Sequence, residues 1–341
     1  MNNLKTQILT DDETGIKSAA QIIKQGGIVA FPTETVYGLG ANAFDSDACL
    51  KIYRAKNRAA DNPLIVHISQ ISQLPELVKD IPRKAQILAE KFWGGPLTLI
   101  MKKSEKVPST VTCGMDTVAV RLPLHPTAKR LIELAGVPIA APSANLSGSP
   151  SPVTAQHCIN DLTGRADAII NGDDCDCGVE STILLMTAEP PVLLRPGLVT
   201  VEEIEEAIGE IRIDKAVLNP LSDGRAVLSP GLKYKHYSPK ARVIIVEGES
   251  ADYINYVNKN TDNDTLALCF ENERDKIKSN AIAYGKENDG KSQAHGLFSA
   301  LRLADEMGAQ TVFAHCPDSH GAGLAVMNRL LRAAGFEKIK V

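Results

Sequence analysis

Short apolar segments alternate with amphipathic helical segments along most of this chain, and no other feature limits its fold as strongly. Residues 11–26 carry apolar side chains at helical spacing, and residues 28–31 then form an apolar run typical of a buried strand. Further strands are predicted at residues 64–68, 97–101, 118–122, 137–141, 168–170, 182–185 and 192–194, and further helices at residues 45–55, 82–92, 126–135 and 201–208. Strands interleaved with helices indicate an α/β fold with a mixed sheet.

The alternation stops after Gly209 and starts again later in the chain. Residues 215–240 lack periodicity and hold several prolines and glycines, as long connecting segments do. The second alternation has strands predicted at residues 243–246, 265–270 and 312–314 and helices at residues 293–307 and 322–334. We therefore predict a first domain over residues 1–209, a linker or lid over residues 210–240 and a small α/β domain over residues 241–341.

The composition is that of an ordinary globular protein with balanced charge. The 341 residues include 37 Lys and Arg against 41 Asp and Glu, a formal net charge of −4, which argues against a protein that coats nucleic acid. No run approaches the roughly 18–20 apolar residues of a membrane helix. The N-terminus has no apolar signal core and the seven cysteines are an odd number, so we expect a cytoplasmic protein with reduced thiols.

Several predicted strands of the first domain are directly followed or preceded by short polar loops. Residues 32–40 follow a buried strand and combine threonines with two glycines, while residues 142–148 and 178–182 offer small hydroxyl and amide side chains. Ligands of α/β proteins bind at the carboxyl ends of strands. No Ser-His-Asp or Cys-His set stands out, so the pattern predicts a site that works by positioning and charge neutralisation rather than by covalent catalysis.

Cations accompany these loops. Arg54, Lys56 and Arg58 alternate in one segment, an arrangement suited to phosphate. Arg121 lies within an apolar predicted strand, where a desolvated charge requires an anion. That anion is either a carboxylate of this chain or the carboxylate of a ligand. His67, in another apolar strand, is either a core residue or part of a site.

Residues 285–292 match the phosphate-loop pattern G-x4-G-K-[ST] letter for letter. The preceding residues 281–284 form only a weak strand pattern, and Glu287 and Asp289 would repel phosphates. We interpret the match as a chance agreement. A phosphate-loop nucleotidase that uses Lys291 is the alternative enzyme hypothesis.

The motifs taken together resemble YrdC-like threonylcarbamoyl-AMP synthases. The resemblance runs in the family's order through residues 32–40, Lys56-x-Arg58 with Asn62-Pro63-Leu64, and residues 117–123, 142–148 and 178–182. Residues 229–240 are similar to the linker of the long, two-domain form, and residues 323–330 to the closing helix of its second domain. The resemblance implies a twisted sheet of parallel and antiparallel strands flanked by helices, followed by a smaller Rossmann-like C-terminal domain.

The resemblance also implies a reaction. L-threonine and bicarbonate or CO2 give N-carboxy-threonine, whose carboxylate attacks the α-phosphate of ATP to form threonylcarbamoyl-AMP and pyrophosphate. Mg²⁺ is expected as the counter-ion of the phosphates. A partner tRNA threonylcarbamoyl transferase complex is expected to pass the group to a tRNA adenosine.

Roles for individual residues follow from the resemblance. Lys56 and Arg58 are the expected catalytic residues. The implied ATP-binding residues are Lys56, Arg58, Asn62, Thr117, Ser143, Ser151, Arg195 and Tyr237, and the implied threonine-binding residues are Thr33, His67, Arg121, Ala141 and Ser181. No metal ligand is assigned. The family's glycine between the lysine and the arginine is Asn57 here, and its following proline is Ala59.

An RNA-binding module is a hypothesis of a different class. Related folds bind double-stranded RNA through a basic concave face, and the cations of residues 54–58 could form such a patch. The net charge of −4 weighs against it.

Overall fold

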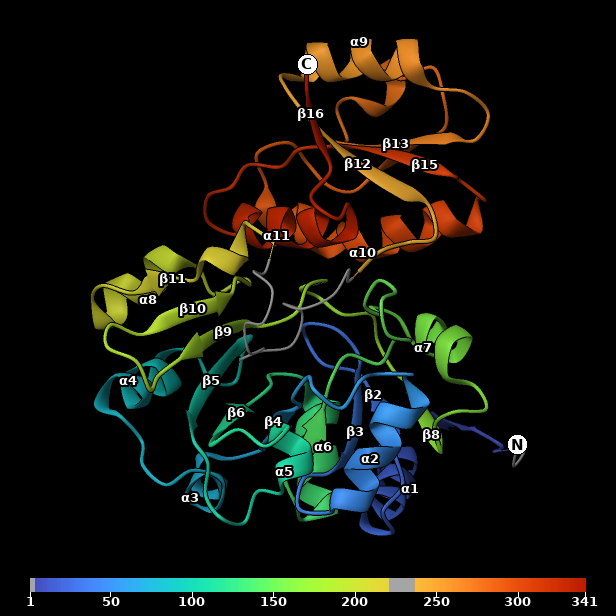
Figure 1. Cartoon of the computed structure of the whole chain (residues 1–341). Coiled ribbons are helices and arrows are strands. Elements are labelled where there is room, and N and C mark those ends of the chain that lie inside the picture. The colour runs from blue at the N-terminus through green and yellow to red at the C-terminus, as the bar shows by residue number, and fades with distance from the viewer. Residues whose placement is uncertain (1–3, 221–236) are drawn as a thin grey trace.

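The computed structural model describes residues 4–220 and 237–341, which form two stacked units (Figure 1). The first unit contains β1 (Gln7–Thr10), β2 (Val29–Phe31), β3 (Gly38–Asn42), β4 (Ile65–His67), β5 (Leu97–Lys102), β6 (Thr117–Arg121), β7 (Ile139–Ala141), β8 (Ala168–Asn171), β9 (Thr182–Leu185), β10 (Val192–Arg195) and β11 (Arg212–Ile213). Its helices are α1 (Glu13–Lys24), α2 (Ser46–Ala55), α3 (Leu74–Leu77), α4 (Arg83–Phe92), α5 (Ser109–Thr112), α6 (Pro126–Ala135), α7 (Ala155–Leu162) and α8 (Val201–Ile208), with short 3-10 turns at Ile71–Gln73 and Lys215–Val217. The second unit contains β12 (Arg242–Glu247), α9 (Ser250–Asn260), β13 (Thr265–Cys269), a 3-10 turn at Arg274–Lys276, β14 (Ala281–Ala283), α10 (Gly290–Glu306), β15 (Thr311–His315), α11 (Gly323–Ala333) and β16 (Lys338–Lys340).

The first sheet is mixed, as predicted. Its strand order is β1-β8-β2-β3-β7-β4-β6-β5-β9-β10-β11, with both parallel and antiparallel neighbours. Val29 and Phe31 of β2 pack with α1 and α6 on one face, whereas Ile28 and Ala30 face the core that contains α2. This alternation along one strand is what allows helices to cover both faces.

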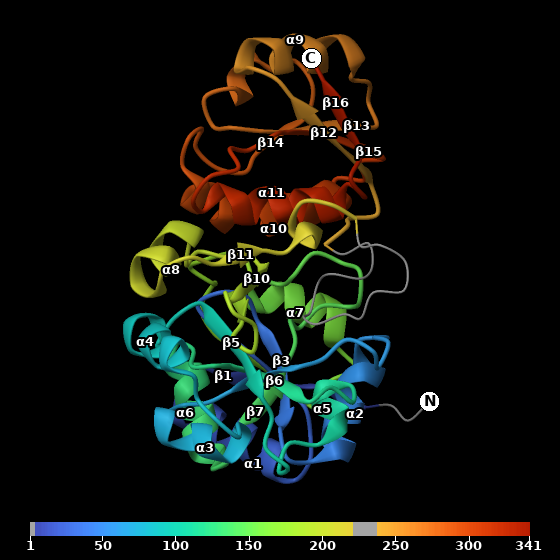
Figure 2. The ribbon, with the colours of Figure 1, turned by 60° about the vertical axis from the view of Figure 1, so that its left-hand side comes forward.

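The second sheet is parallel throughout the described residues, in the order β14-β13-β15-β12-β16. Helix α9 covers one face, while α10 and α11 lie on the face toward the first unit (Figures 1 and 2). Helix α11 is buried at every residue because it lies between this sheet and the first unit. The first unit's core and the inner face of the second sheet form one continuous apolar cluster.

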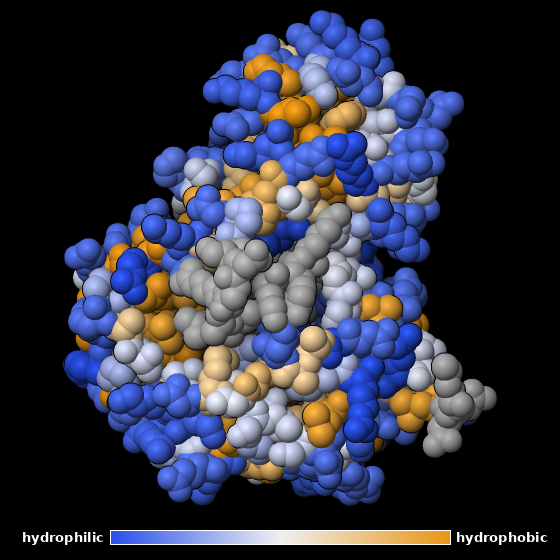
Figure 3. Space-filling model, viewed as in Figure 1, coloured by the Kyte–Doolittle hydropathy of each residue, from blue (hydrophilic) through white to orange (hydrophobic). Residues whose placement is uncertain are grey.

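The two units approach each other closely at Gly178. This residue has a φ of +74°, and a Cβ there would lie 2.3 Å from the Ala294 carbonyl oxygen of α10. Only glycine combines that backbone conformation with that approach. Nearby, His295 Nδ1 lies 2.9 Å from the carbonyl oxygen of Asp176. Side chains on the face seen in Figure 3 are largely hydrophilic over both units.

The strongly periodic predicted elements are present, and the differences lie in short or glycine-containing segments. Residues 32–40 do not form a single loop, because Gly38–Asn42 is a strand (β3) paired antiparallel with β2. Gly40 is required there, since a Cβ would lie 2.5 Å from Ile139 and 2.7 Å from the Phe31 ring. The expected linker begins with a strand, β11, that extends the first sheet. Residues 221–236 of that linker lie outside the described residues, and the domain limits stay predictions.

No described helix has both the length and the apolar character needed to cross a membrane.

Candidate active site

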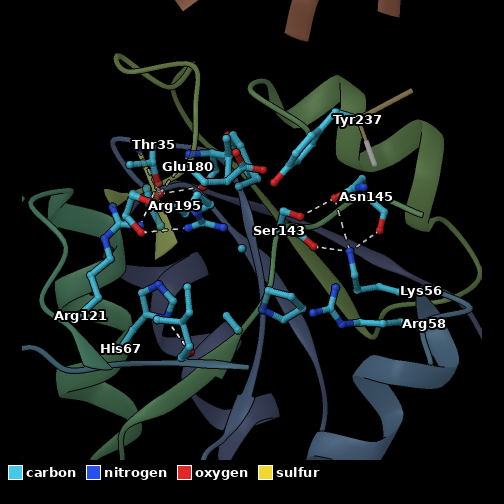
Figure 4. Close-up of a pocket in the computed structure, with 18 of the residues that line it drawn as sticks. Thr35, Lys56, Arg58, His67, Arg121, Ser143, Asn145, Glu180, Arg195 and Tyr237 are labelled. Carbon is cyan, nitrogen blue, oxygen red and sulfur yellow. Dashed lines mark hydrogen bonds between the residues drawn. The ribbon is translucent and has the colours of Figure 1, made fainter. Parts of the chain in front are cut away.

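A pocket lies in the first unit (Figure 4). The lining comes from the β2–β3 loop, the end of α2, β4, β6 and β7 with the loop after it, the segment before β9 and the end of β10. Four lining residues are cationic, namely Lys56, Arg58, Arg121 and Arg195, and one is a carboxylate, Glu180.

The sheet register brings His67 and Arg121 together at one end of the pocket. In the parallel pairing of β4 with β6, His67 lies opposite Arg121, and β5 places Thr98 opposite Arg121 on its other side. Val120 points into the apolar core, so Arg121 faces the other side of the sheet and lines the pocket.

Arg121 has an internal carboxylate partner, Glu34, which is one of the two kinds of anion that the sequence left open. Its Nη2 lies 2.6 Å from Glu34 Oε1, and both side chains are 4% exposed. Burial alone would raise the pKa of Glu34, but the Arg121 charge and the hydrogen bonds to the carboxylate together lower that pKa. Arg121 Nη1 also donates to the Thr35 hydroxyl at 2.8 Å. Arg121 is therefore held in place before any ligand binds.

The β2–β3 loop supplies hydroxyl groups beside Arg121. Thr33 donates to the carbonyl oxygen of Val36 at 2.7 Å, and its Oγ1 lies 2.9 Å from that of Thr35. This turn of side-chain-to-backbone bonds orders the loop. Both threonines line the pocket, as do His67 and Ala141.

His67 is a neutral imidazole in this environment. Burial and the nearby Arg121 charge lower its pKa to about 3. Its Nδ1 lies 3.1 Å from the Ile65 carbonyl oxygen, and its ring packs edge-on against Phe31. His67 therefore shapes the pocket as an uncharged polar group.

Lys56 and Arg58 form the opposite end of the pocket. Lys56 is buried, and its Nζ donates to the carbonyl oxygens of Ser143 and Asn145, both at 2.5 Å. Burial, with the Arg58 charge, lowers the pKa of Lys56 well below its ordinary value. Between them Asn57 has a φ of +51°, the left-handed conformation that glycine adopts most easily and asparagine next. The family's glycine position is thus preserved in conformation.

Arg54 does not join Lys56 and Arg58 in one exposed patch. Arg54 is exposed, Arg58 is half-buried, and Lys56 is buried. The basic surface that the RNA-binding hypothesis needs is therefore not formed by these three residues.

Arg195 is held beside the threonine and serine hydroxyls of the sheet. Its Nε donates to the Ser181 carbonyl oxygen at 3.0 Å and its Nη2 to the Ser181 hydroxyl at 3.1 Å. The Ser181 hydroxyl lies 2.8 Å from that of Thr98. Burial lowers the pKa of Arg195 to about 10, so it carries its charge at neutral pH.

Tyr237 lies at the edge of the undescribed segment and lines the pocket. Its ring is 5.2 Å from that of Phe298 in α10, and its backbone has a φ of +62°, a conformation that bulky residues rarely adopt. A segment of the expected lid thus contacts both units.

The pocket gathers most of the residues that the resemblance assigned. Those that line it are Thr33, Lys56, Arg58, His67, Arg121, Ala141, Ser143, Ser181, Arg195 and Tyr237. Three others lie outside the lining. Asn62 is buried behind Arg58, whose Nη2 donates to its carbonyl oxygen at 3.1 Å. Thr117 begins β6, at the far end of that strand from Arg121, and Ser151 is buried behind Glu180. Ligand-binding roles for all these residues stay predictions.

Glu34, Thr35 and Glu180 lie in segments expected near the site, residues 32–40 and 178–182, but the sequence indicates no individual role for them. Glu34 and Thr35 contact Arg121, and Glu180 lines the pocket. The available signal was the requirement of Arg121 for an anion, but nothing in the sequence says which carboxylate supplies it.

Residues 285–292 do lie between a strand, β14, and a helix, α10. The loop is nevertheless closed by its own side chains. Asp289 accepts hydrogen bonds from the N–H groups of Lys291 and Ser292 at the start of α10, and Ser292 Oγ accepts one from Lys286 N. A carboxylate thus occupies the position at which a phosphate loop holds its phosphate. This geometry does not support the nucleotidase alternative.

Within residues 4–220 and 237–341, no group of three or more His, Cys, Asp or Glu side chains could hold a metal ion. Both oxygens of the pocket carboxylate, Glu180, already have partners in Ser151 and Arg329. The pocket residues therefore do not fit a resident metal.

Comparisons with known proteins show the family of this chain. Residues 21–197 match the Sua5/YciO/YrdC family model, described as "Telomere recombination", and residues 199–335 match the model of the threonylcarbamoyl-AMP synthase C-terminal domain. The chain is 48% identical over 339 residues to the threonylcarbamoyl-AMP synthase of Pyrococcus abyssi, with 97% of each chain covered. It is 45% identical to that of Bacillus subtilis, with 98% of this chain and 97% of that one covered.

The structural comparison leads to the same family. The crystal structure of P. abyssi Sua5 complexed with L-threonine superimposes with a TM-score of 0.91 at 45% identity, covering 98% of this chain and 100% of that one. The predicted fold class and the family resemblance are both confirmed. The chain belongs to the Sua5/YrdC family of threonylcarbamoyl-AMP synthases.

Proposed function

We propose that this chain synthesises L-threonylcarbamoyl-AMP and pyrophosphate from L-threonine, bicarbonate or CO2 and ATP. The observation that carries the proposal is the division of one pocket into two ends of different chemistry (Figure 4). Arg121, His67 and the side-chain hydroxyl groups of the β2–β3 loop form one end of the pocket, which suits a small hydroxy amino acid. Lys56 and Arg58 with the loop after β7 form the other, which suits a nucleotide triphosphate. The P. abyssi relative, described in complex with L-threonine, supports the amino-acid end.

The proposed chemistry is a nucleotidyl transfer. A carboxylate oxygen of N-carboxy-threonine attacks the α-phosphorus of ATP, the bond from that phosphorus to the bridging oxygen breaks, and pyrophosphate leaves with the electron pair. No protein group forms a covalent bond. In Figure 4 Arg195 lies between the two ends, where a fixed guanidinium stabilises charge that develops on the α-phosphate.

We further propose that Mg²⁺ enters as the counter-ion of ATP rather than as a resident metal. The cationic pocket and the absence of a carboxylate cluster among the described residues support this proposal. The product is a mixed anhydride, so the reaction that consumes it is an acyl transfer. We propose a tRNA threonylcarbamoyl transferase complex in the cytoplasm as the acceptor system.

The test uses the purified full-length chain with ATP, L-threonine and ¹⁴C-bicarbonate. We expect label in threonylcarbamoyl-AMP and an equal amount of pyrophosphate, with both at background when threonine or bicarbonate is omitted. Pyrophosphate release without threonine, or formation of ADP and phosphate instead, would contradict the proposal. Removing Mg²⁺ with a chelator is expected to stop the reaction without unfolding the protein.

A further inference from the structure

The carboxylate in the pocket belongs to the first unit, but its cationic partner comes from the second. Arg329 of α11 is fully buried, and its Nε lies 2.8 Å from Glu180 Oε2. The other oxygen of Glu180 accepts a hydrogen bond from Ser151 at 2.6 Å. Within the described chain, this ion pair links α11 directly to a residue that lines the pocket.

Arg329 also holds the main chain on both sides of the Arg195–Ser181 contact. Its Nη2 donates to the Glu180 carbonyl oxygen at 3.2 Å, one residue before Ser181. Its Nη1 donates to the Pro196 carbonyl oxygen at 2.9 Å, one residue after Arg195. A single guanidinium therefore ties together the two segments that present Arg195 and Ser181.

A carboxylate is unfavourable in a pocket for a polyphosphate unless its charge is balanced. Coulomb repulsion between Glu180 and a triphosphate is strong at a buried site, where screening by solvent is weak. Burial alone would raise the pKa of Glu180, but the charges of Arg329 and Arg195 lower it below its ordinary value, so Glu180 is ionised. Without Arg329, Arg195 would be the main cation left to balance Glu180.

We propose that Arg329, on the second unit, is a positioning residue for the nucleotide end of the pocket. It neutralises Glu180 and fixes the adjoining main chain, so that the positive charge of Arg195 stays available to the phosphates of ATP. This inference rests on the proposed function, because it assumes that the pocket binds ATP. It gives the second unit a role in the reaction beyond covering the first.

The interface offers a matched control. Arg302 of α10 forms another ion pair between the units, with its Nη2 2.8 Å from Asp161 Oδ2 of α7. It also donates to the Pro150 carbonyl oxygen at 2.6 Å. Neither Arg302 nor Asp161 lines the pocket. Arg302→Met therefore removes a comparable contact between the units and leaves Glu180, Arg195 and their hydrogen bonds unchanged.

The experiment compares full-length Arg329→Met, Glu180→Gln, the double variant and Arg302→Met by ATP binding and by KM for threonine. We expect Arg329→Met to weaken ATP binding about 30-fold at pH 8, the loss of one buried charge compensation. Adding Glu180→Gln should restore ATP affinity to within about 3-fold, because no carboxylate is left unbalanced. Arg302→Met should change ATP affinity less than about 3-fold. In all four variants, KM for threonine should change less than ATP affinity does.

The pH dependence of ATP binding shows whether Arg329 acts through its charge or through its packing. The charged and titratable groups that face Glu180 are Arg329, Arg195, Tyr237 and, further away, Lys56. Once Arg329 is removed, the buried Glu180 carboxyl has a higher pKa and takes up a proton as the pH falls. The ATP-binding defect of Arg329→Met should therefore shrink between pH 8 and pH 6, and the wild-type protein should show no such recovery.

Three outcomes would overturn the inference. ATP binding could be as weak in the double variant as in Arg329→Met, the loss of ATP affinity in Arg329→Met could be the same at pH 8 and pH 6, or Arg302→Met could lose as much ATP affinity as Arg329→Met. If Arg329→Met does not fold, Glu180→Gln alone decides, because the inference predicts ATP affinity equal to or tighter than that of the wild type. A weaker affinity in Glu180→Gln would contradict it. ATP binding is measured without turnover, so a chain that binds ATP but makes no threonylcarbamoyl-AMP would defeat only the proposed function.

Discussion

Two segments of this molecule carry the residues of a phosphate site, and the structure treats them in opposite ways. In one, Lys56 and Arg58 lie at the end of α2 and face a pocket that holds a further cation, Arg195. In the other, residues 285–292, the N–H groups at the start of α10 already bind Asp289, while Glu287 binds Ser250 and Asn272 nearby. The better match to a motif is therefore the poorer anion site.

The difference teaches that an anion site is defined by how charges are arranged in the folded chain rather than by residue types alone. The pattern G-x4-G-K-[ST] specifies residue types, but it does not say which acceptor the donors meet in the folded chain. At the first segment the fold brings Lys56 and Arg58, which follow α2, into one pocket with cations from the distant strands β6 and β10. At the second segment, the Asp289 carboxylate accepts hydrogen bonds from the N–H groups that a phosphate would need, and the Glu287 carboxylate would repel a phosphate.

The largest expected effect tests the contrast between the two phosphate-like segments directly. Lys56→Met should lower kcat/KM for ATP about 1,000-fold, because it removes a buried cation and the bonds that hold the loop after β7. Lys291→Met should change it less than about 2-fold. Both are measured as threonine-dependent pyrophosphate release, with thermal unfolding to confirm that each variant is folded. A loss confined to Lys291→Met would reverse the assignment in favour of the nucleotidase.

A smaller effect sharpens the comparison within the pocket. Arg121→Met combined with Glu34→Gln should raise KM for threonine about 100-fold and KM for ATP less than about 3-fold, since one carboxylate-binding guanidinium is lost. The double change is used because Arg121→Met alone would leave Glu34 buried without its cation. Equal losses for both substrates would show that Arg121 supports the whole pocket rather than the threonine end.

The sequence predicted the elements whose periodicity is strong, and most of the residues that the family motifs imply line one pocket. It did not predict β3, because its two glycines have low strand propensity, and Gly40 is required only by the Phe31 ring and Ile139 that pack on it. The Glu34–Arg121 and Glu180–Arg329 ion pairs could not be predicted from the sequence either. Each joins residues far apart in the chain, and local patterns carry no information about such contacts.

The smallest expected effect tests the comparison with a matched pair of residues. Asn57 and Asn288 both adopt left-handed backbone conformations, with φ of +51° and +61°, one in each phosphate-like segment. Replacing either by alanine should cost about 1 kcal/mol of unfolding free energy, because a Cβ without a compensating polar group disfavours this conformation, and glycine should cost less. Unfolding in urea measures these differences.

Only one of the two alanine variants should affect nucleotide binding. Asn57→Ala shifts the backbone between Lys56 and Arg58, so KM for ATP should rise about 3- to 5-fold, whereas Asn288→Ala should leave it within error. Asn57→Gly should keep KM for ATP near the wild-type value, because glycine adopts the same φ without strain. An equal rise in KM for ATP in Asn57→Ala and Asn288→Ala would mean that both segments contact the nucleotide, and the contrast between them would fail.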